Sequence, residues 1–214
     1  MGCCSSPSTR CARIAPQHGW PFELDTWVRY EVVDDGLTVT HGVENRAARP
    51  APYAVGTHPY LRIGDVPIAE LRLTVPASRF FEVDERMNPT AESPVDGTGA
   101  DVRTPRPVGE LDLDTAFGGL TLAPLPGEPD ASVRGASAWL EAPDGRRLTL
   151  WQNADWGFVQ VFTTQIFPKA GERVAAVAVE PMTAPPDALN SGQGLIWLEP
   201  GERWEGSWGL VYGA

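Results

Sequence analysis

Residues 31–40, EVVDDGLTVT, place Asp34-Asp35-Gly36 between two runs of alternating apolar and polar residues. An Asp-Gly pair between β-branched runs is typical of the tight turn of a β-hairpin. The stretch from Glu23 to Val33 is therefore predicted to be one strand, and the run after the turn the next. The same pattern recurs in residues 138–151, where Pro143-Asp144-Gly145 separates two further short apolar runs. Two such hairpins predict antiparallel strands.

Other segments of the chain have strand patterns as well. Apolar and polar residues alternate with period two in residues 68–75 and 158–162. Residues 173–180 form a near-continuous Val/Ala run, the pattern expected of a strand covered on both faces. Residues 195–198 and 204–212 complete the predicted strands. No stretch has helical spacing over three turns, so we expect an all-β protein, one domain built as a large antiparallel β-sandwich.

The composition and net charge of the chain disfavour some classes of binding partner. The 214 residues are 42% hydrophobic, and the 22 Gly and 21 Pro indicate many turns. A net charge of −11 disfavours binding to nucleic acid or to an anionic membrane. No apolar run approaches the ~18 residues that span a bilayer. The three cysteines all lie in residues 1–11, so the rest of the chain has neither a disulfide framework nor a thiolate metal site. We expect no nucleic-acid or membrane partner and a cytoplasmic protein.

The first residues differ from the rest of the chain. Residues 1–15 are small, polar and without apolar periodicity. Met1–Ser6 fits a myristoylation signal, but that match needs only a Gly and a Ser, so we prefer a disordered tail. Residues 16–214 are then a single sandwich domain. The Pro- and Gly-rich residues 86–108 and 121–135 are predicted to be long surface loops, which often carry binding function.

Of the three histidines, His58 is the candidate for chemistry. It follows a short apolar run and precedes Pro59, which forces an extended backbone at His58, so its ring is expected to project from a strand end. A structural histidine with satisfied hydrogen bonds is the alternative. His18 lies in a predicted loop. His41 lies at the end of a predicted strand, in a register that could face solvent.

Two carboxylates are further candidates. Glu180 ends the apolar run of residues 174–179 and precedes Pro181. A carboxylate at the end of a buried strand is desolvated unless paired, which raises its pKa toward the range useful for a general base. A buried Glu paired with backbone donors or an Arg is the alternative. Asp114 is the third candidate, although an Asp before a Thr is more often a helix cap or turn residue.

Together these segments resemble the aldose 1-epimerase (galactose mutarotase) family. The matching stretches run in family order over essentially residues 16–213: Gly19–Phe22, Arg49–Tyr53, Gly56–Tyr60, Leu113–Phe117, Val179–Pro186 and Trp197–Glu202. The resemblance implies a galactose mutarotase-like supersandwich and a small sugar substrate, with no metal or cofactor. It also implies that Glu180 is the general base, that His58 is the general acid and that Asp114 contacts sugar hydroxyls. Their side-chain tips should share one cleft, with acid and base about one sugar ring apart.

The resemblance implies a reaction and also a departure from the family. We expect an aldose 1-epimerase that interconverts the α and β anomers of a free aldohexose through acid/base ring opening. Family members normally have a further N-terminal block of strands with a sugar-binding Arg and a His-Gly pair, and residues 1–15 show nothing like it. We therefore expect an N-terminally truncated sandwich with impaired activity. A non-catalytic or vestigial carbohydrate-binding sandwich and a structural interaction module remain as alternatives.

Overall fold

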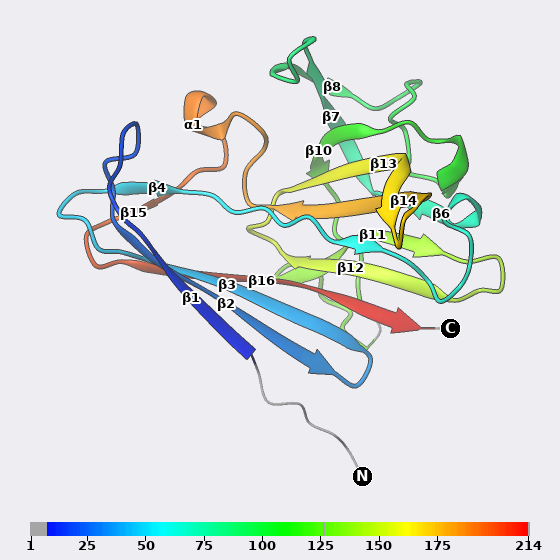
Figure 1. The fold of residues 1–214 in the computed structure, drawn as a ribbon, viewed down its shortest axis with the longest axis horizontal. Helices are drawn as coiled ribbons and strands as arrows, with labels where there is room; N and C mark the ends of the chain where they lie inside the picture. Colours follow the sequence, from blue (N-terminus) through cyan, green and yellow to red (C-terminus); the bar gives the residue numbers. More distant parts are fainter. Residues whose placement is uncertain (1–7, 126, 214) are drawn as a thin grey trace.

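The computed structural model describes residues 8–125 and 127–213 of the chain. All strand pairs within this part are antiparallel. Its helices are short: α1 (Ala188–Ser191) and two 3₁₀ helices, Ile68–Glu70 and Val108–Glu110. The strands form two large sheets and one small one (Figure 1). The all-β prediction is therefore confirmed.

The larger sheet has eight strands in the order β1-β2-β3-β16-β12-β11-β6-β9. Their bounds are β1 (Ser8–Ile14), β2 (Leu24–Val33), β3 (Gly36–Asn45), β16 (Arg203–Gly213), β12 (Arg147–Asn153), β11 (Arg134–Glu141), β6 (Arg72–Thr74) and β9 (Arg106–Pro107). The second sheet has six strands in the order β5-β14-β13-β10-β7-β8. Their bounds are β5 (Tyr60–Leu61), β14 (Glu172–Met182), β13 (Phe158–Lys169), β10 (Asp114–Leu120), β7 (Ala77–Val83) and β8 (Pro89–Pro94). The small sheet pairs β4 (Ala51–Tyr53) with β15 (Ile196–Leu198).

Both predicted Asp-Gly hairpins are present. β2 and β3 pair along their full length, and their turn falls on Asp34 and Asp35. β11 and β12 pair around the second turn, where Gly145 has a φ of 90°. Glycine adopts that conformation without the steric cost that a side chain would add.

The hydrophobic core lies between the two large sheets. Alternate residues of a strand point to opposite faces, so one set of each alternating run can face the other sheet. Fully buried side chains from both sheets form one cluster, which includes Leu73, Leu140 and Leu150 of the larger sheet and Phe117, Val159 and Val161 of the smaller one. The structure is thus the expected β-sandwich.

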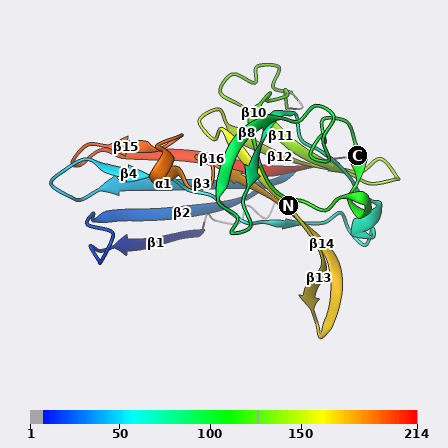
Figure 2. The same ribbon diagram turned by 90° about the horizontal axis from the view of Figure 1, so that it is seen from above.

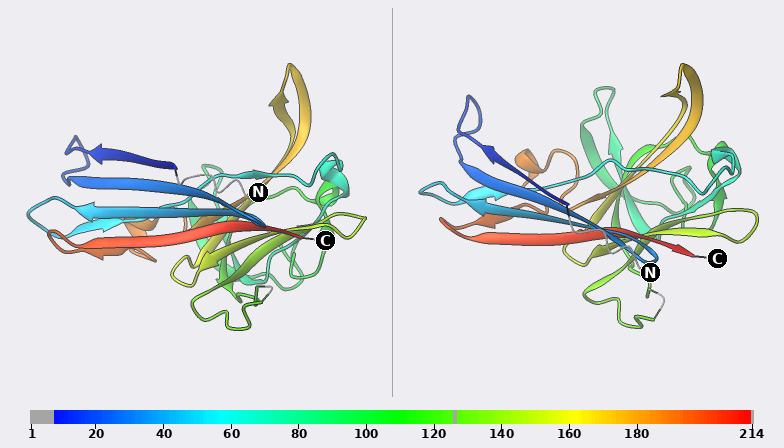
Figure 3. Two further views of the ribbon diagram at one scale, coloured as in Figure 1. Left: turned by 90° about the horizontal axis from the view of Figure 1, so that it is seen from below. Right: turned by 60° about the horizontal axis from the view of Figure 1, so that its bottom comes forward.

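The hairpin of β13 and β14 extends beyond the rest of the sandwich, as Figures 2 and 3 show. Residues 176–179 of β14 are buried, but Arg173 is exposed and Val174 only partly buried. The prediction that residues 173–180 are covered on both faces is therefore wrong for the first part of the run. An apolar run alone does not show how far the neighbouring elements extend over it.

Residues 8–14 form a strand, in contrast to the predicted disordered tail. β1 pairs with β2 at all seven of its residues, and Arg13 forms an ion pair with Asp25 (2.7 Å). These residues form a strand because β2 provides backbone hydrogen-bond partners. Their own sequence lacks apolar periodicity and does not predict a strand. The prediction is wrong for these residues, and the Met1–Ser6 segment lies outside the described part of the chain.

The predicted loop over residues 86–108 is partly structured. It contains β8 and β9, and it buries Val95, Val102 and Val108 in the core. Residues 121–125 and 127–133 follow the prediction more closely, since their only sheet contacts are isolated bridges.

Candidate active site

The candidate site lies on the outer face of the six-stranded sheet. Val159 and Val161 of β13 face the core, so Gln160 between them points outward. Glu180 on β14 is directly opposite Gln160, which is in turn opposite Ala116 on β10. One row across three neighbouring strands therefore carries a carboxylate, an amide and a small side chain that leaves open space.

The segment between β4 and β5 carries His58 along β14. The residues on either side of His58 hydrogen-bond to the residues on either side of Glu180: Thr57 N–H donates to the Pro181 carbonyl (3.2 Å), and Val179 N–H donates to the Pro59 carbonyl (3.3 Å). The backbone therefore holds the two side chains next to each other. Because the Pro181 carbonyl points to this segment, the missing N–H of Pro181 removes no bond from the ladder between β14 and β13.

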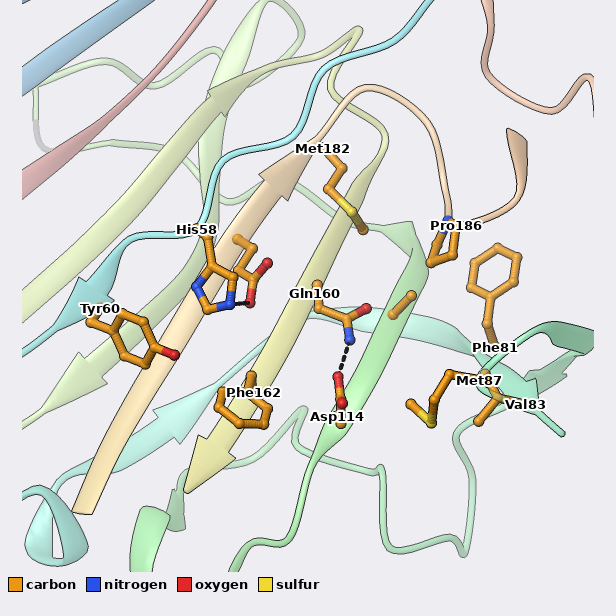
Figure 4. Close-up of a pocket in the computed structure, with 12 residues that line it drawn as sticks. His58, Tyr60, Phe81, Val83, Met87, Asp114, Gln160, Phe162, Met182 and Pro186 are labelled. Carbon is orange, nitrogen blue, oxygen red and sulfur yellow. Dashed lines mark hydrogen bonds and ion pairs between the residues drawn. The ribbon is translucent and has the colours of Figure 1, made fainter. Parts of the chain in front are cut away.

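His58 and Glu180 are in direct contact. His58 Nε2 lies 3.2 Å from Glu180 Oε1. The imidazole stacks on Tyr60 at a centroid distance of 4.9 Å, and Phe162 approaches it edge-on at 6.2 Å (Figure 4). Two aromatic rings thus restrict the orientation of the imidazole. The His58 side chain is 52% exposed and that of Glu180 only 13%, so the carboxylate is the more desolvated member of the pair.

The environment of Glu180 suits proton exchange near neutral pH. Burial, and to a smaller extent the negative charge of Asp114, raise the pKa of Glu180 from an ordinary 4.5 to about 7. The direction of this pKa change is the one expected from the sequence. A carboxyl group with a pKa near the working pH can both accept and return a proton.

Asp114 is the first residue of β10, opposite Phe162 on β13, and not a loop or cap residue. Its Oδ1 accepts a hydrogen bond from Gln160 Nε2 (2.7 Å). Gln160 was not among the candidates from the sequence. Its signal is an amide on the outward face of an alternating strand, between Phe158 and Phe162.

A cleft of about 540 Å³ brings together the three residues predicted from the sequence, His58, Glu180 and Asp114. The acid and base candidates lie closer to each other than the expected one sugar ring. Two groups in direct contact can exchange protons with two oxygen atoms that are bonded to the same carbon.

The other two histidines lie outside the cleft. His18 is exposed in a turn, as predicted. The expectation that His41 could face solvent is wrong: it lies on the same face of β3 as the fully buried Val39. Its Nε2 accepts from Trp208 Nε1 (3.3 Å), and its ring packs 5.6 Å from that of Trp156. Burial lowers the pKa of His41, which favours the neutral ring.

Within residues 8–125 and 127–213, no three His, Cys, Asp or Glu side chains come together in a way that could hold a metal ion. No helix within them is long and apolar enough to cross a membrane.

Comparison with known proteins identifies the family. The family model for aldose 1-epimerase matches residues 9–210. This chain belongs to the aldose 1-epimerase family. The matched range contains all three predicted site residues.

Relatives in the aldose 1-epimerase family match different shares of the chain. The uncharacterized protein YihR of Escherichia coli K12 is 29% identical over 91% of this chain and 58% of its own length. The galactose mutarotase of Sus scrofa is 32% identical over 46% of this chain and 30% of its own length. The chain thus spans less than two thirds of these relatives.

Solved structures show the same fold. A GalM/aldose epimerase homologue from C. elegans superposes with a TM-score of 0.78 at 21% identity, covering 97% of this chain and 65% of that one. The galactose 1-epimerase of Lactobacillus acidophilus NCFM gives a TM-score of 0.73 at 19% identity, with 99% and 64% covered. The galactose mutarotase-like sandwich expected from the sequence is confirmed.

Proposed function

We propose that this chain interconverts the α and β anomers of a free aldohexose, with Glu180 as general base and His58 as general acid. The observation that carries the proposal is the 3.2 Å contact between His58 Nε2 and Glu180 Oε1. It places a half-exposed imidazole beside a carboxyl group whose pKa is about 7. The chain that carries this pair belongs to the aldose 1-epimerase family.

Ring opening uses both groups at one carbon. The Glu180 carboxylate takes the proton of the C1 hydroxyl while protonated His58 donates its Nε2 proton to O5. The C1–O5 bond breaks, its electron pair goes to O5, and C1 becomes an aldehyde. The pair changes from carboxylate and imidazolium to carboxylic acid and neutral imidazole, so its total proton count is unchanged.

Ring closure reverses these roles. After rotation about the C1–C2 bond, the O5 hydroxyl attacks the opposite face of the aldehyde. His58 takes the proton of O5, and Glu180 returns its proton to the oxygen on C1. Both groups regain their starting states, and each positioned group can contribute on the order of 10²–10⁴-fold to the rate.

The neighbouring polar groups suit the rest of the sugar. Asp114 Oδ1 already accepts one hydrogen bond from Gln160, and a carboxylate has further acceptor sites for hydroxyl donors. Both residues lie beside the acid/base pair in the same cleft. We assign them to ring hydroxyls of the sugar.

The test is polarimetry on freshly dissolved α-D-glucose and α-D-galactose. Glu180→Gln keeps the size of the side chain but removes the base, so catalysed mutarotation should fall by about 10²–10⁴-fold. His58→Asn should have a similar effect.

The matched control is His18→Asn, because His18 is exposed and outside the cleft. His41→Asn is a poorer control, since it would remove the partner of the Trp208 indole. If the unsubstituted chain (the parent) is active and the Glu180→Gln variant keeps the same rate of mutarotation, the assignment of Glu180 as general base is wrong. A parent that binds sugar without accelerating mutarotation favours the carbohydrate-binding alternative.

A further inference from the structure

The cleft has a second half that the proposed reaction does not use. His58 and Tyr60 lie at one end of it, with His58 in contact with Glu180, and Asp114 lies between that end and Met87 (Figure 4). Much of the remainder is lined by apolar side chains: Phe81, Val83, Met87, Met182 and Pro186. Figure 4 shows Phe81, Val83, Met87 and Pro186 grouped at the end opposite His58 and Tyr60.

The cleft is longer than one sugar ring. Its lining residues come from β14, β13, β10 and β7, which are consecutive in the sheet. Neighbouring strands lie about 4.8 Å apart, so β14 with Glu180 and β7 with Phe81 are separated by about 14 Å. A pyranose with C1 at Glu180 and hydroxyls at Asp114 and Gln160 occupies the region over β14, β13 and β10. The side of the cleft next to β7 stays free.

A fixed turn presents Met87 at this free end. Met87 has a φ of 64°, a left-handed conformation that residues with a side chain rarely adopt. Asp84 Oδ1 accepts the N–H groups of Arg86 (2.8 Å) and Asn88 (2.9 Å), and the Asp84 carbonyl accepts that of Met87 (3.0 Å). The Met87 side chain is nevertheless 48% exposed. Strained residues of this kind cluster at binding sites.

The opposite wall is connected to the same hairpin of β7 and β8. Pro186 lies in the segment that follows β14, and Gln193 of that segment donates from Nε2 to Glu92 Oε2 on β8 (3.3 Å). Glu92 also pairs with Arg79 on β7 (3.1 Å). These contacts connect the segment that follows β14 with the hairpin of β7 and β8, the two elements that carry the apolar walls of the free end.

We propose that this apolar half is a subsite for a C–H-rich substituent on O4 of the reducing sugar. The inference rests on the proposed function, because that function places C1 beside the contacting side chains of His58 and Glu180. C4 is the ring atom opposite C1, so a group on O4 extends toward β7. An alkyl, acyl or aryl group and the apolar face of a second sugar ring share this chemistry, since both gain affinity by removing apolar surface from water.

Isothermal titration calorimetry on the full chain tests the subsite with three probes: D-glucose, cellobiose and 4-O-benzyl-D-glucose. We expect 4-O-benzyl-D-glucose to bind about tenfold more tightly than glucose, because the benzyl group is buried against apolar walls. Tighter binding of cellobiose as well identifies a second sugar ring as an occupant. Tighter binding of the benzyl sugar alone identifies an apolar group.

Met87→Asn locates the effect within the cleft. Asn tolerates a positive φ, so the turn is retained while the apolar side chain is replaced by a polar one. We expect this variant to lose most of the preference for 4-O-benzyl-D-glucose and to keep the parent's affinity for glucose. Leu189→Asn is the matched control, because Leu189 is 67% exposed on α1 and does not line the cleft.

The outcomes separate the subsite from the reaction. Equal affinity for the three probes overturns the subsite, and so does a Met87→Asn chain that keeps the full preference. Neither result affects the loss of mutarotation expected for Glu180→Gln. A different result is a preference for 4-O-benzyl-D-glucose that depends on Met87, together with full mutarotation by the Glu180→Gln variant. That result overturns the acid/base assignment but supports the apolar site.

Discussion

Glu180 is the residue whose surroundings have the clearest consequence for the pH dependence of activity. Its pKa of about 7 means that the carboxylate is lost as pH falls through neutrality. Mutarotation catalysed by the parent should therefore decline on the acid side with an apparent pKa near 7. Polarimetric kcat/KM measured across this range checks the prediction. A decline centred near 4.5, the ordinary value, would contradict it.

Asp114 contributes to the same pKa through its negative charge. Asp114→Asn removes that charge, so the acid decline should shift to lower pH while KM rises from the loss of a hydroxyl contact. Asp112→Asn makes the same charge change two residues earlier at an exposed position outside the cleft, and it should leave the profile in place. Equal shifts from both variants would show a general charge effect.

Glu180 should also make stability depend on pH. Its folded pKa is raised above its unfolded value of about 4.5, so the folded state holds the proton more tightly. The associated stability is present below the unfolded pKa and is lost as pH rises through the folded pKa of about 7. Relative to Glu180→Gln, the parent should lose up to about 3 kcal/mol between these limits. Denaturant unfolding at both ends of the range measures this difference, and parallel stability curves would refute it.

At the level of elements, the start of β10 depends on a buried contact with β13. Leu113 N–H donates to Thr163 Oγ1 (2.9 Å), and Thr163 N–H donates to the Leu113 carbonyl (2.8 Å). Thr163→Val keeps the shape but leaves the Leu113 N–H without its buried acceptor, at a cost of about 1–3 kcal/mol. Asp114 is the next residue, so KM should rise as well.

Thr163→Ser is the control for this prediction, because it keeps the hydroxyl acceptor. Thermal unfolding and polarimetric KM should place the Ser variant near the parent and the Val variant clearly below it. A Val variant with parental stability would show that the Leu113 N–H finds another partner.

Some elements could be predicted from the sequence and others could not. The hairpins were predictable because an Asp-Gly turn and its alternating flanks are local signals. β10 was not, since its sequence DTAFGGL contains Gly118 and Gly119 and has weak strand preference. It is a strand because β13 and β7 pair with it on either side. β1 depends in the same way on β2.

The same distinction applies to the site. His58 and Glu180 each stand next to a proline at the end of an apolar run, a pattern visible along the chain. Gln160 belongs to the site because of its position opposite Glu180 in the sheet, which depends on register between strands. The burial of His41 likewise depends on Trp208, which is distant in sequence.

For the whole molecule, net charge and sheet edges have opposite effects on association. A net charge of −11 repels copies of the chain from one another. β5 pairs with only Val177 and Ala178 of β14. In the part of the chain that the structure describes, no strand therefore pairs with residues 172–176 on that side. Ile166 in the same hairpin is 60% exposed. Open edges of this kind can pair with another chain.

Salt should therefore promote self-association. The Debye length falls from about 30 Å at ~0.01 M to about 3 Å at ~1 M salt, which removes most of the repulsion but not the apolar or backbone contacts. Sedimentation velocity at both salt concentrations should show larger species at high salt. Ile166→Lys, which adds a charge at the open hairpin, should reduce them more than Val133→Lys, which changes a comparably exposed residue in a loop. A monomer at both salt concentrations would contradict this prediction, because neither charge screening nor the open edge of β14 would then promote association.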